Sequence, residues 1–354
     1  MPLHRREAGL ADRTKMTGIR AMLKLGPSLT GGPEGRAAYD DMLSKLDAAT
    51  DVSFEPEIVG GVPGWWCHPA ERGDAALLYF HGGAYVVGAA WAYRAFVSQI
   101  VARSGASAFI PDYGLGPERP FPAAFDDGVS TFRAIAARFD HFALVGDSAG
   151  GGLALAIASH GAHDAALSSG PQPRGLALMS PWTDLSLSGA SMTSKADDDP
   201  LLTRDMLAAA VHNYLGEGSA RDPRASPVFA DLSALPPLLI HVGEDEVLLD
   251  DSTRVMERVE ASGGDARMEI GAGMIHVFPS MYEHLTTSTT ALDDIGQFLR
   301  ARLQSAWAGA AAFGGVPPPA TSSANELLRR SEDTSAALPV CADCCCYVST
   351  GQQV

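Results

Sequence analysis

The chain has 354 residues, of which 46% are hydrophobic and 19% are charged, so it has a globular composition and enough length for one large domain or two smaller ones. Its formal net charge of −16 argues against nucleic acid or an anionic membrane surface as a partner. The polar start, and the lack of any apolar run of about 20 residues, predict a cytoplasmic protein without a signal peptide or a membrane span.

In chain order, residues 1–50 are typical of a polar helical segment with breaks at Gly-Pro sequences, and strands and helices alternate after it. The predicted strands are 52–59, 64–68, 75–80, 107–111, 142–146, 175–180, 238–243 and 266–270. The predicted helices are 91–103, 123–139, 149–160, 252–261 and 287–304. Several strands are continuous apolar runs, which predicts an α/β fold with a mostly parallel eight-stranded sheet, helices on both faces, and an antiparallel pair at the start.

A long connection between Pro181 and Pro237 interrupts this alternation with loops and one helical run at 204–214. So long an insertion in a compact sheet protein indicates a cap or lid. We therefore predict a helical cap segment at 1–50, an α/β domain at 51–305 with a cap insertion at 183–230, and a disordered tail at 306–354.

The sequence "GDSAG", residues 146–150, follows an apolar strand and opens a helix of small residues. A G-x-S-x-G sequence in this context places a serine on a sharp strand-to-helix turn, where bulky neighbours would clash. The turn lifts the hydroxyl of Ser148 above the sheet, and the nearby helix N-terminus favours negative charge. We interpret Ser148 as a nucleophile; a purely structural turn is the alternative.

The sequence "HGGAYVVG", residues 81–88, also follows an apolar strand directly. Glycine allows the backbone to approach a ligand without a Cβ in the way. In such an architecture, N–H groups of this loop and of the residue after the nucleophile bind an oxyanion. The predicted donors are Gly82, Gly83 and Ala149, with His81 bracing the loop.

A nucleophilic serine needs a base, which in this chain order follows an acid. Four histidines lie far enough downstream: His212, His241, His276 and His284. His276 is predicted to be the base, because it lies on a glycine-flanked loop after the last strand. Three acids follow the strand at 238–243, and of Glu244, Asp245 and Glu246 we select Asp245 as the acid that orients the base; these acids could instead solvate the loop.

Five motifs in order resemble those of the hormone-sensitive-lipase-like branch of the α/β-hydrolases, the bacterial family IV carboxylesterases. The chain is similar to it in HGG at 81–83, GDSAG at 146–150, the acidic loop at 245–251, G-x-x-H-x-F at 273–278, and the Pro-rich loop at 112–127. It departs from the family at Gly114 and Gly116, where Arg and Ala are usual. The family's D-P-L is aligned here with Asp245-Glu246-Val247.

The resemblance spans roughly residues 35 to 305 and implies a helical cap and esterase activity without a metal or an organic cofactor. The function expected is a serine carboxylesterase that acts on short- to medium-chain esters through an acyl-enzyme. The expected partner is a small-molecule ester, with no nucleic acid or membrane, and a homodimer is the candidate assembly. The alternatives are a lactone or amide hydrolase, a non-catalytic small-molecule receptor, and a lipase acting on lipid droplets.

Aromatic residues near these motifs are candidates for an acyl or alcohol pocket, and core packing is the alternative for each. They are Tyr85, Trp91, Tyr93, Trp182 and Tyr214. The cysteines at 341 and 344–346 resemble half of a zinc site, but four ligands within six residues cannot easily surround a metal tetrahedrally. We therefore predict no metal site.

Overall fold

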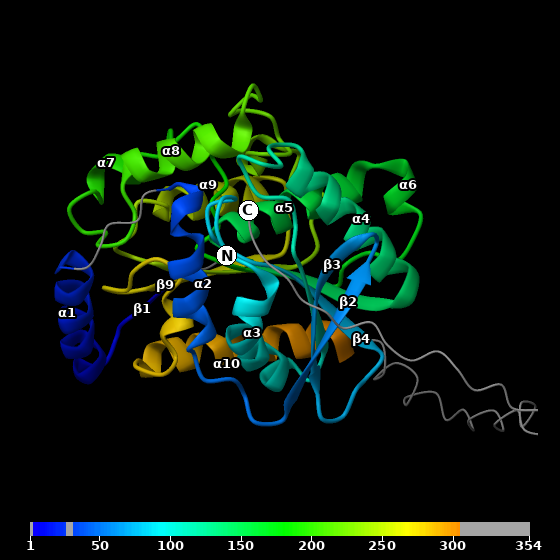
Figure 1. Ribbon diagram of the computed structural model, residues 1–354, viewed down its shortest axis with the longest axis horizontal. Coiled ribbons are helices and arrows are strands. Elements are labelled where there is room, and N and C mark those ends of the chain that lie inside the picture. The colour runs from blue at the N-terminus through cyan, green and yellow to red at the C-terminus, as the bar shows by residue number, and fades with distance from the viewer. Residues whose placement is uncertain (1–2, 26–30, 305–354) are drawn as a thin grey trace, which may run out of the picture. The chain divides into compact units, whose positions relative to one another are not determined.

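The computed structural model describes residues 3–25 and 31–304, which fold around one nine-stranded sheet (Figure 1). The strands are β1 (Leu3–Arg6), β2 (Val52–Val59), β3 (Val62–Pro69), β4 (Ala75–Phe80), β5 (Ser107–Pro111), β6 (His141–Asp147), β7 (Leu176–Met179), β8 (Leu238–Gly243) and β9 (Ala266–Gly271). They lie in the order β1-β9-β8-β7-β6-β4-β5-β3-β2. Only the pairs β2–β3 and β3–β5 are antiparallel. The predicted mostly parallel sheet with an early antiparallel pair is therefore confirmed.

The predicted helices are present, with ends that move by a few residues, and the four-residue helices α6 and α7 were not predicted. They are α1 (Leu10–Leu25), α2 (Arg36–Ser44), α3 (Ala90–Ser104), α4 (Ala123–Arg138), α5 (Ser148–His163), α6 (Ala165–Ser168), α7 (Ser191–Ser194), α8 (Arg204–Leu215), α9 (Leu249–Ala261) and α10 (Thr286–Gln304). Three short 3-10 helices span Pro33–Gly35, Pro227–Phe229 and Phe278–Met281. Among the described residues, no helix is long and apolar enough to cross a membrane.

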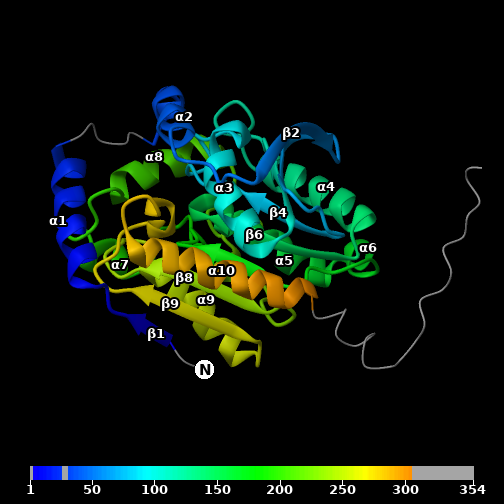
Figure 2. The ribbon, with the colours of Figure 1, turned by 90° about the horizontal axis from the view of Figure 1, so that it is seen from below.

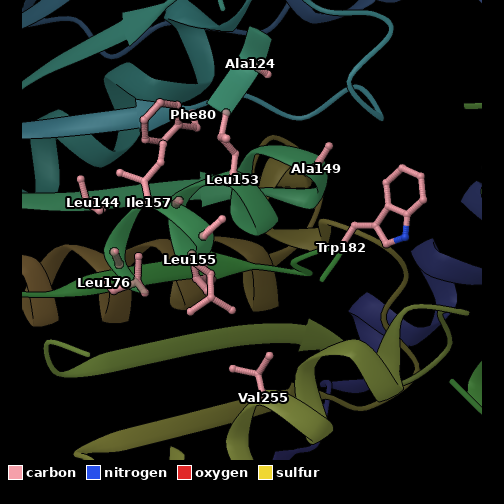
Figure 3. Packing of buried hydrophobic residues seen from close by; sticks show 14 of the residues in the cluster. Phe80, Ala124, Leu144, Ala149, Leu153, Leu155, Ile157, Leu176, Trp182 and Val255 are labelled. Atoms are coloured by element: carbon pink, nitrogen blue, oxygen red, sulfur yellow. The ribbon is translucent and has the colours of Figure 1, made fainter. Parts of the chain in front are cut away.

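Two layers of helices bury the two faces of the sheet. Residues of α4, α5 and α9 pack on one face in one core cluster, and residues of α3 and α10 pack on the other face in a second cluster. Figure 3 shows Leu153 and Ile157 of α5 among Phe80 and Leu144 of the strands. Because both faces are covered, β4, β6, β7 and β8 are almost fully buried, which explains their continuous apolar sequences.

The ninth strand, β1, was not predicted, because residues 1–50 were interpreted as helical. Its sequence is Leu-His-Arg-Arg, and it pairs in parallel with β9, with Leu3 opposite Met268 (Figure 2). Arg6 also forms an ion pair with Glu269 of β9 at 3.5 Å. A four-residue polar edge strand carries too little hydrophobic pattern to be recognised before its neighbour is known.

The N-terminal helices and the insertion between β7 and β8 contact each other. A guanidinium N–H of Arg20 donates to the carbonyl oxygen of Asp198 at 2.6 Å, and the side-chain amide of Asn213 donates to the carbonyl oxygen of Gly31 at 3.1 Å. Asp198 and Asn213 belong to the insertion, which also contains α7 and α8. The described parts of the two segments predicted to form a cap therefore touch. The predicted tail, 306–354, lies outside the described residues.

Candidate active site

Ser148 sits on the sharp turn that joins β6 to α5, as the G-x-S-x-G spacing predicted. Its φ of +52° lies in the left-handed region, a strained conformation for a residue with a Cβ. The flanking glycines leave no room for side chains. A Cβ on Gly146 would lie 2.4 Å from the carbonyl oxygen of Gly150, and one on Gly150 would lie 2.1 Å from that of Phe80. The two glycines are therefore required because the backbone packs closely around them, as well as because the chain turns sharply at Ser148.

The imidazole of His276 links this serine to a carboxylate. Its Nε2 lies 2.9 Å from Oγ of Ser148, and its Nδ1 lies 2.6 Å from Oε2 of Glu246. An ionised carboxylate can only accept, so Nδ1–H donates to Glu246. In the neutral ring Nε2 then accepts from the serine hydroxyl, which is the geometry needed to remove the hydroxyl proton.

Glu246 is fully buried and is held by donors on both oxygens. Oε1 accepts from Oγ of Ser180 at 2.7 Å and from the backbone N–H of Gly243 at 2.6 Å. Oε2 is left to His276. A buried carboxylate without partners would be costly, and these three donors compensate its loss of water.

The prediction that Asp245 orients the base is wrong in this structure. Its carboxylate accepts from Arg20 at 2.6 Å on Oδ2 and from Lys195 at 3.3 Å on Oδ1. About a fifth of the Asp245 side chain is exposed, whereas Glu246 is buried. Consecutive residues of the turn after β8 point in different directions, so only one of them can reach His276.

The signal for Glu246 was present in the sequence. Val247 and Leu248 are apolar and buried, so this part of the turn faces the interior. Moving the family's D-P-L by one residue aligns it with Glu246-Val247-Leu248, where the leucine matches. The change from Asp to Glu at the acid position concealed this alignment.

Burial and charge have opposite effects on the pKa of His276. Burial lowers the pKa of His276, but the negative charge of Glu246 and the hydrogen bond to it raise the pKa, helped by Asp199 and Asp147. The charges outweigh burial, so the pKa of His276 lies above its ordinary value. The surroundings therefore stabilise the imidazolium that forms when the ring takes a proton.

The glycine-rich loop after β4 lies against the turn that carries Ser148. The N–H of Gly82 donates to Oδ1 of Asp147 at 2.9 Å, so it is not available for an oxyanion, and that prediction is wrong. Within the described residues, the N–H groups of Gly83 and Ala84 donate to no other group. Gly83 has a φ of +113°, and a Cβ there would lie 2.1 Å from the carbonyl oxygen of Val87, so only glycine fits. Ala149 lies in the first turn of α5, where backbone N–H groups have no partner within the helix.

Two buried side chains fix this loop from behind. His81, predicted to brace it, has Nδ1 2.7 Å from the carbonyl oxygen of Gly82, and its ring stacks on Tyr113 at 4.4 Å between centroids. Asp147 accepts from Tyr79 at 2.6 Å and from Tyr93 at 3.2 Å. Burial raises the pKa of Asp147 to about 6, even though these donors lower it. Tyr93 thus supports the loop through Asp147.

Three of the predicted pocket aromatics form one buried group. The rings of Tyr85 and Tyr214 stack at 4.0 Å, and the rings of Tyr85 and Trp182 lie 6.2 Å apart. The backbone N–H of Trp182 donates to the carbonyl oxygen of Ser148 at 2.8 Å, which places this group beside the serine. Trp91 lies on the first turn of α3 with 41% of its surface exposed, and no ring contact joins it to the group.

Among the described residues, no group of three or more histidine, cysteine, aspartate or glutamate side chains could hold a metal ion. The four cysteines of the tail lie outside these residues. Cys67 is buried in β3, and burial raises the pKa of its thiol. The polar groups gathered around Ser148 are thus a hydroxyl, an imidazole, carboxylates and backbone N–H groups.

Comparison with known proteins agrees with this geometry. Residues 77–280 match the model of a family described as having an alpha/beta hydrolase fold. An acetyl-hydrolase of Streptomyces hygroscopicus is 36% identical over 75% of this chain and 88% of its own length. An esterase of Acinetobacter venetianus is 30% identical over 79% of this chain and 93% of its own length.

Solved structures give the same result. The crystal structure of a hormone-sensitive lipase from a metagenome library matches with a TM-score of 0.75 and 35% identity, over 81% of this chain and 98% of that one. An esterase from the bacterial hormone-sensitive lipase family matches with a TM-score of 0.75 and 35% identity, over 82% of this chain and 98% of that one. The chain therefore belongs to the α/β-hydrolase fold family, in its hormone-sensitive-lipase-like branch.

Proposed function

We propose that this protein is a serine carboxylesterase that hydrolyses short- to medium-chain carboxylic esters through an acyl-enzyme intermediate. The observation that carries the proposal is the continuous hydrogen-bonded chain from Ser148 through His276 to Glu246. The relatives are named esterase and acetyl-hydrolase, and these names support hydrolysis of an ester bond. A non-catalytic receptor would not need this chain of donors and acceptors.

In the proposed mechanism, Oγ of Ser148 attacks the ester carbonyl as Nε2 of His276 takes its proton. Glu246 holds the ring in the required tautomer and stabilises its positive charge. His276 then protonates the leaving alcohol, and a water molecule activated by the same ring releases the acid. The first proton transfer uses the contact between Ser148 and His276, and the contact between His276 and Glu246 supports the ring in every step.

We propose that the oxyanion is bound by the N–H groups of Gly83, Ala84 and Ala149. Gly83 and Ala149 are retained from the sequence prediction, and Ala84 replaces Gly82, whose N–H is used by Asp147. Each such donor is expected to contribute about 10²–10³-fold to the rate. Tyr85, Trp182 and Tyr214 are proposed to line the acyl or alcohol pocket, with Tyr214 supplied by α8 of the insertion.

The predicted division into a cap formed by 1–50 and 183–230 over the main domain is part of this proposal. The contacts from Arg20 to Asp198 and from Asn213 to Gly31 support it. Cytoplasmic location and homodimeric assembly remain predictions. A lactone or amide hydrolase with the same residues is the remaining alternative, since the geometry at Ser148 serves any of these acyl groups.

The test is hydrolysis of p-nitrophenyl acetate, butyrate, octanoate and laurate by the wild type and by Ser148→Ala. We expect the shorter esters to react, and we expect Ser148→Ala to lose about 10⁴-fold or more in kcat, because the nucleophile is missing. A matching γ-lactone and anilide, assayed beside the esters, distinguish the alternatives. Equal rates for the two proteins, or no hydrolysis of any ester by the wild type, would contradict the proposal.

A further inference from the structure

The segment that follows β7, residues 180–182, contacts Ser148, Glu246 and the residue after His276. β7 lies between β6, which leads to the serine, and β8, which leads to the acid. The backbone N–H of Trp182 donates to the carbonyl oxygen of Ser148 at 2.8 Å. The backbone N–H of Ser180 donates to the carbonyl oxygen of His241 in β8 at 2.8 Å. This segment thus connects the two strand ends that the reaction depends on.

The hydroxyl of Ser180 joins the acid to the base loop directly. It donates to Oε1 of Glu246 at 2.7 Å and accepts from the backbone N–H of Val277, the residue after His276, at 3.0 Å. A serine hydroxyl has one proton to donate, and here that proton is given to the carboxylate. One atom therefore sets the distance between the loop that carries the acid and the loop that carries the base.

The backbone at both ends of this bridge is strained. Ser180 is fully buried and has a φ of +46°, and Val277 has a φ of +49°. Residues with a Cβ keep such conformations only where their surroundings hold them, and such residues gather at functional sites. A glycine would adopt these angles at less cost. The presence of serine at position 180 therefore indicates that its side chain is needed.

A glutamate needs this restraint more than an aspartate does. Its side chain has one more rotatable bond, so its carboxylate has more positions to choose from. Ser180 and Gly243 hold Oε1, and this directs Oε2 at Nδ1 of His276. We propose that Ser180 is a positioning residue for the ester hydrolysis proposed above, which it serves by fixing Glu246 and, through that carboxylate, the imidazole of His276. The proposal rests on that function.

The first test compares kcat and KM for p-nitrophenyl butyrate in the wild type, Ser180→Ala and Ser180→Gly. We expect kcat to fall by about 10–100-fold in both variants with KM little changed, the effect typical of a lost supporting hydrogen bond behind a reacting group. Ser180→Gly relieves the backbone strain, so it keeps the test valid if Ser180→Ala folds poorly. Ser98→Ala is the matched control: Ser98 is also fully buried, and its hydroxyl also donates once and accepts once, but in α3. It should keep the wild-type kcat.

The second test asks whether Ser180 acts through Glu246. In a Glu246→Gln background, Ser180→Ala should lower kcat by less than threefold, because the carboxylate that it positions is already gone. A full 10–100-fold loss in that background would overturn the proposal. So would an unchanged kcat in Ser180→Gly with an active wild type.

A pH profile separates positioning from simple loss of stability. With a loosened Glu246, the acidic limb of kcat/KM in Ser180→Gly should move to lower pH, since the contact with Glu246 raises the pKa of His276. An unmoved limb together with a lowered kcat would contradict the proposal. A wild type that hydrolyses no ester would overturn the esterase function and this inference together, whereas the outcomes above with an active wild type overturn this inference alone.

Discussion

Asp245 and Glu246 are consecutive carboxylates in very different surroundings. Asp245 is partly exposed between Arg20 and Lys195, and these contacts hold the turn to α1 and to the insertion. Glu246 is buried and takes donors from Ser180, Gly243 and His276. Neutralising each of them should therefore have a different result, although the two substitutions remove the same charge.

We expect Glu246→Gln to lower kcat for p-nitrophenyl butyrate by about 10³–10⁴-fold, because the amide no longer fixes the imidazole tautomer or balances its charge. Asp245→Asn should keep kcat within about threefold. Steady-state kinetics of the two purified variants give the answer. A larger loss of kcat in Asp245→Asn than in Glu246→Gln would support Asp245 as the acid and would contradict the contact between Glu246 and His276.

The pH dependence of the rate follows from His276. In the proposed mechanism its neutral form is the base, so kcat/KM should rise with pH as the imidazolium loses its proton. Glu246 raises the pKa of His276 against the effect of burial. The midpoint of the rise in kcat/KM should therefore lie above the ordinary histidine pKa of about 6.5. Rates measured from pH 5 to 9 in buffers of constant ionic strength test this. A midpoint below the ordinary value would show that Glu246 does not act on the ring as the structure indicates.

At the scale of elements, α1 is attached to the rest of the domain by several side chains, among them Asp12, Lys15 and Arg20. Its Asp12 accepts from the backbone N–H groups of Thr286 and Thr287 at 3.2 and 2.7 Å and so caps the start of α10. Its Arg20 donates to Asp245 at 2.6 Å and to the carbonyl oxygen of Gly273 at 3.1 Å. The helix therefore contacts both the loop that carries Glu246 and the loop that carries His276.

Removing the contacts of Arg20 should loosen α1. Arg20→Ala is expected to lower the free energy of unfolding by about 1–3 kcal/mol, the usual effect of losing hydrogen bonds to a charged group. Hydrogen exchange in α1 should become faster than in the wild type, and denaturant titration gives the free energy. Arg13→Ala, on the exposed side of the same helix, is the control and should change neither quantity. Equal protection of α1 in all three proteins would show that Arg20 does not hold the helix.

Most helices and strands could be predicted from the sequence because the hydrophobic pattern of each one is local. The buried strands carry continuous apolar runs, and the G-x-S-x-G and HGG motifs require particular turns, so the turn at Ser148 and the loops at Gly83 and His276 could be predicted, whereas the roles of these residues stay proposals. Glu246 was missed because three acids follow one another, and only packing decides which of them points inward. Gly82 was missed as a donor to Asp147 for the same reason, since that contact joins residues 65 positions apart.

At the scale of the whole described domain, buried carboxyls make stability depend on pH. Burial raises the pKa of Asp251 to about 7, although the N–H groups of Thr183 and Asp184 lower it. The folded state therefore keeps the proton that an unfolded aspartate releases at lower pH, near the ordinary pKa of about 3.9. The contribution is fully present below that value and is lost as pH rises towards about 7.

Asp251→Asn should remove this loss, because an amide resembles the protonated acid in shape and does not titrate. Oδ2 of Asp251 accepts from both backbone N–H groups, while Oδ1 has no partner among the described residues. We expect the variant to gain on the wild type in free energy of unfolding as pH rises, so that its advantage is larger at pH 8 than at pH 5. Urea titrations at the two pH values measure this, and the same difference at both would contradict the raised pKa.

The pairing of β1 with β9 affects how the chain can fold during synthesis. Leu3 to Arg6 leave the ribosome before their partners, Met268 to Gly271, which follow after more than 250 further residues. Until then β1 has no strand beside it, and the sheet edge closes only when nearly the whole domain is available. A chain interrupted before residue 266 would therefore expose both the edge of β8 and an unpaired first segment. The two ends of the domain must meet before either is protected from association with other chains.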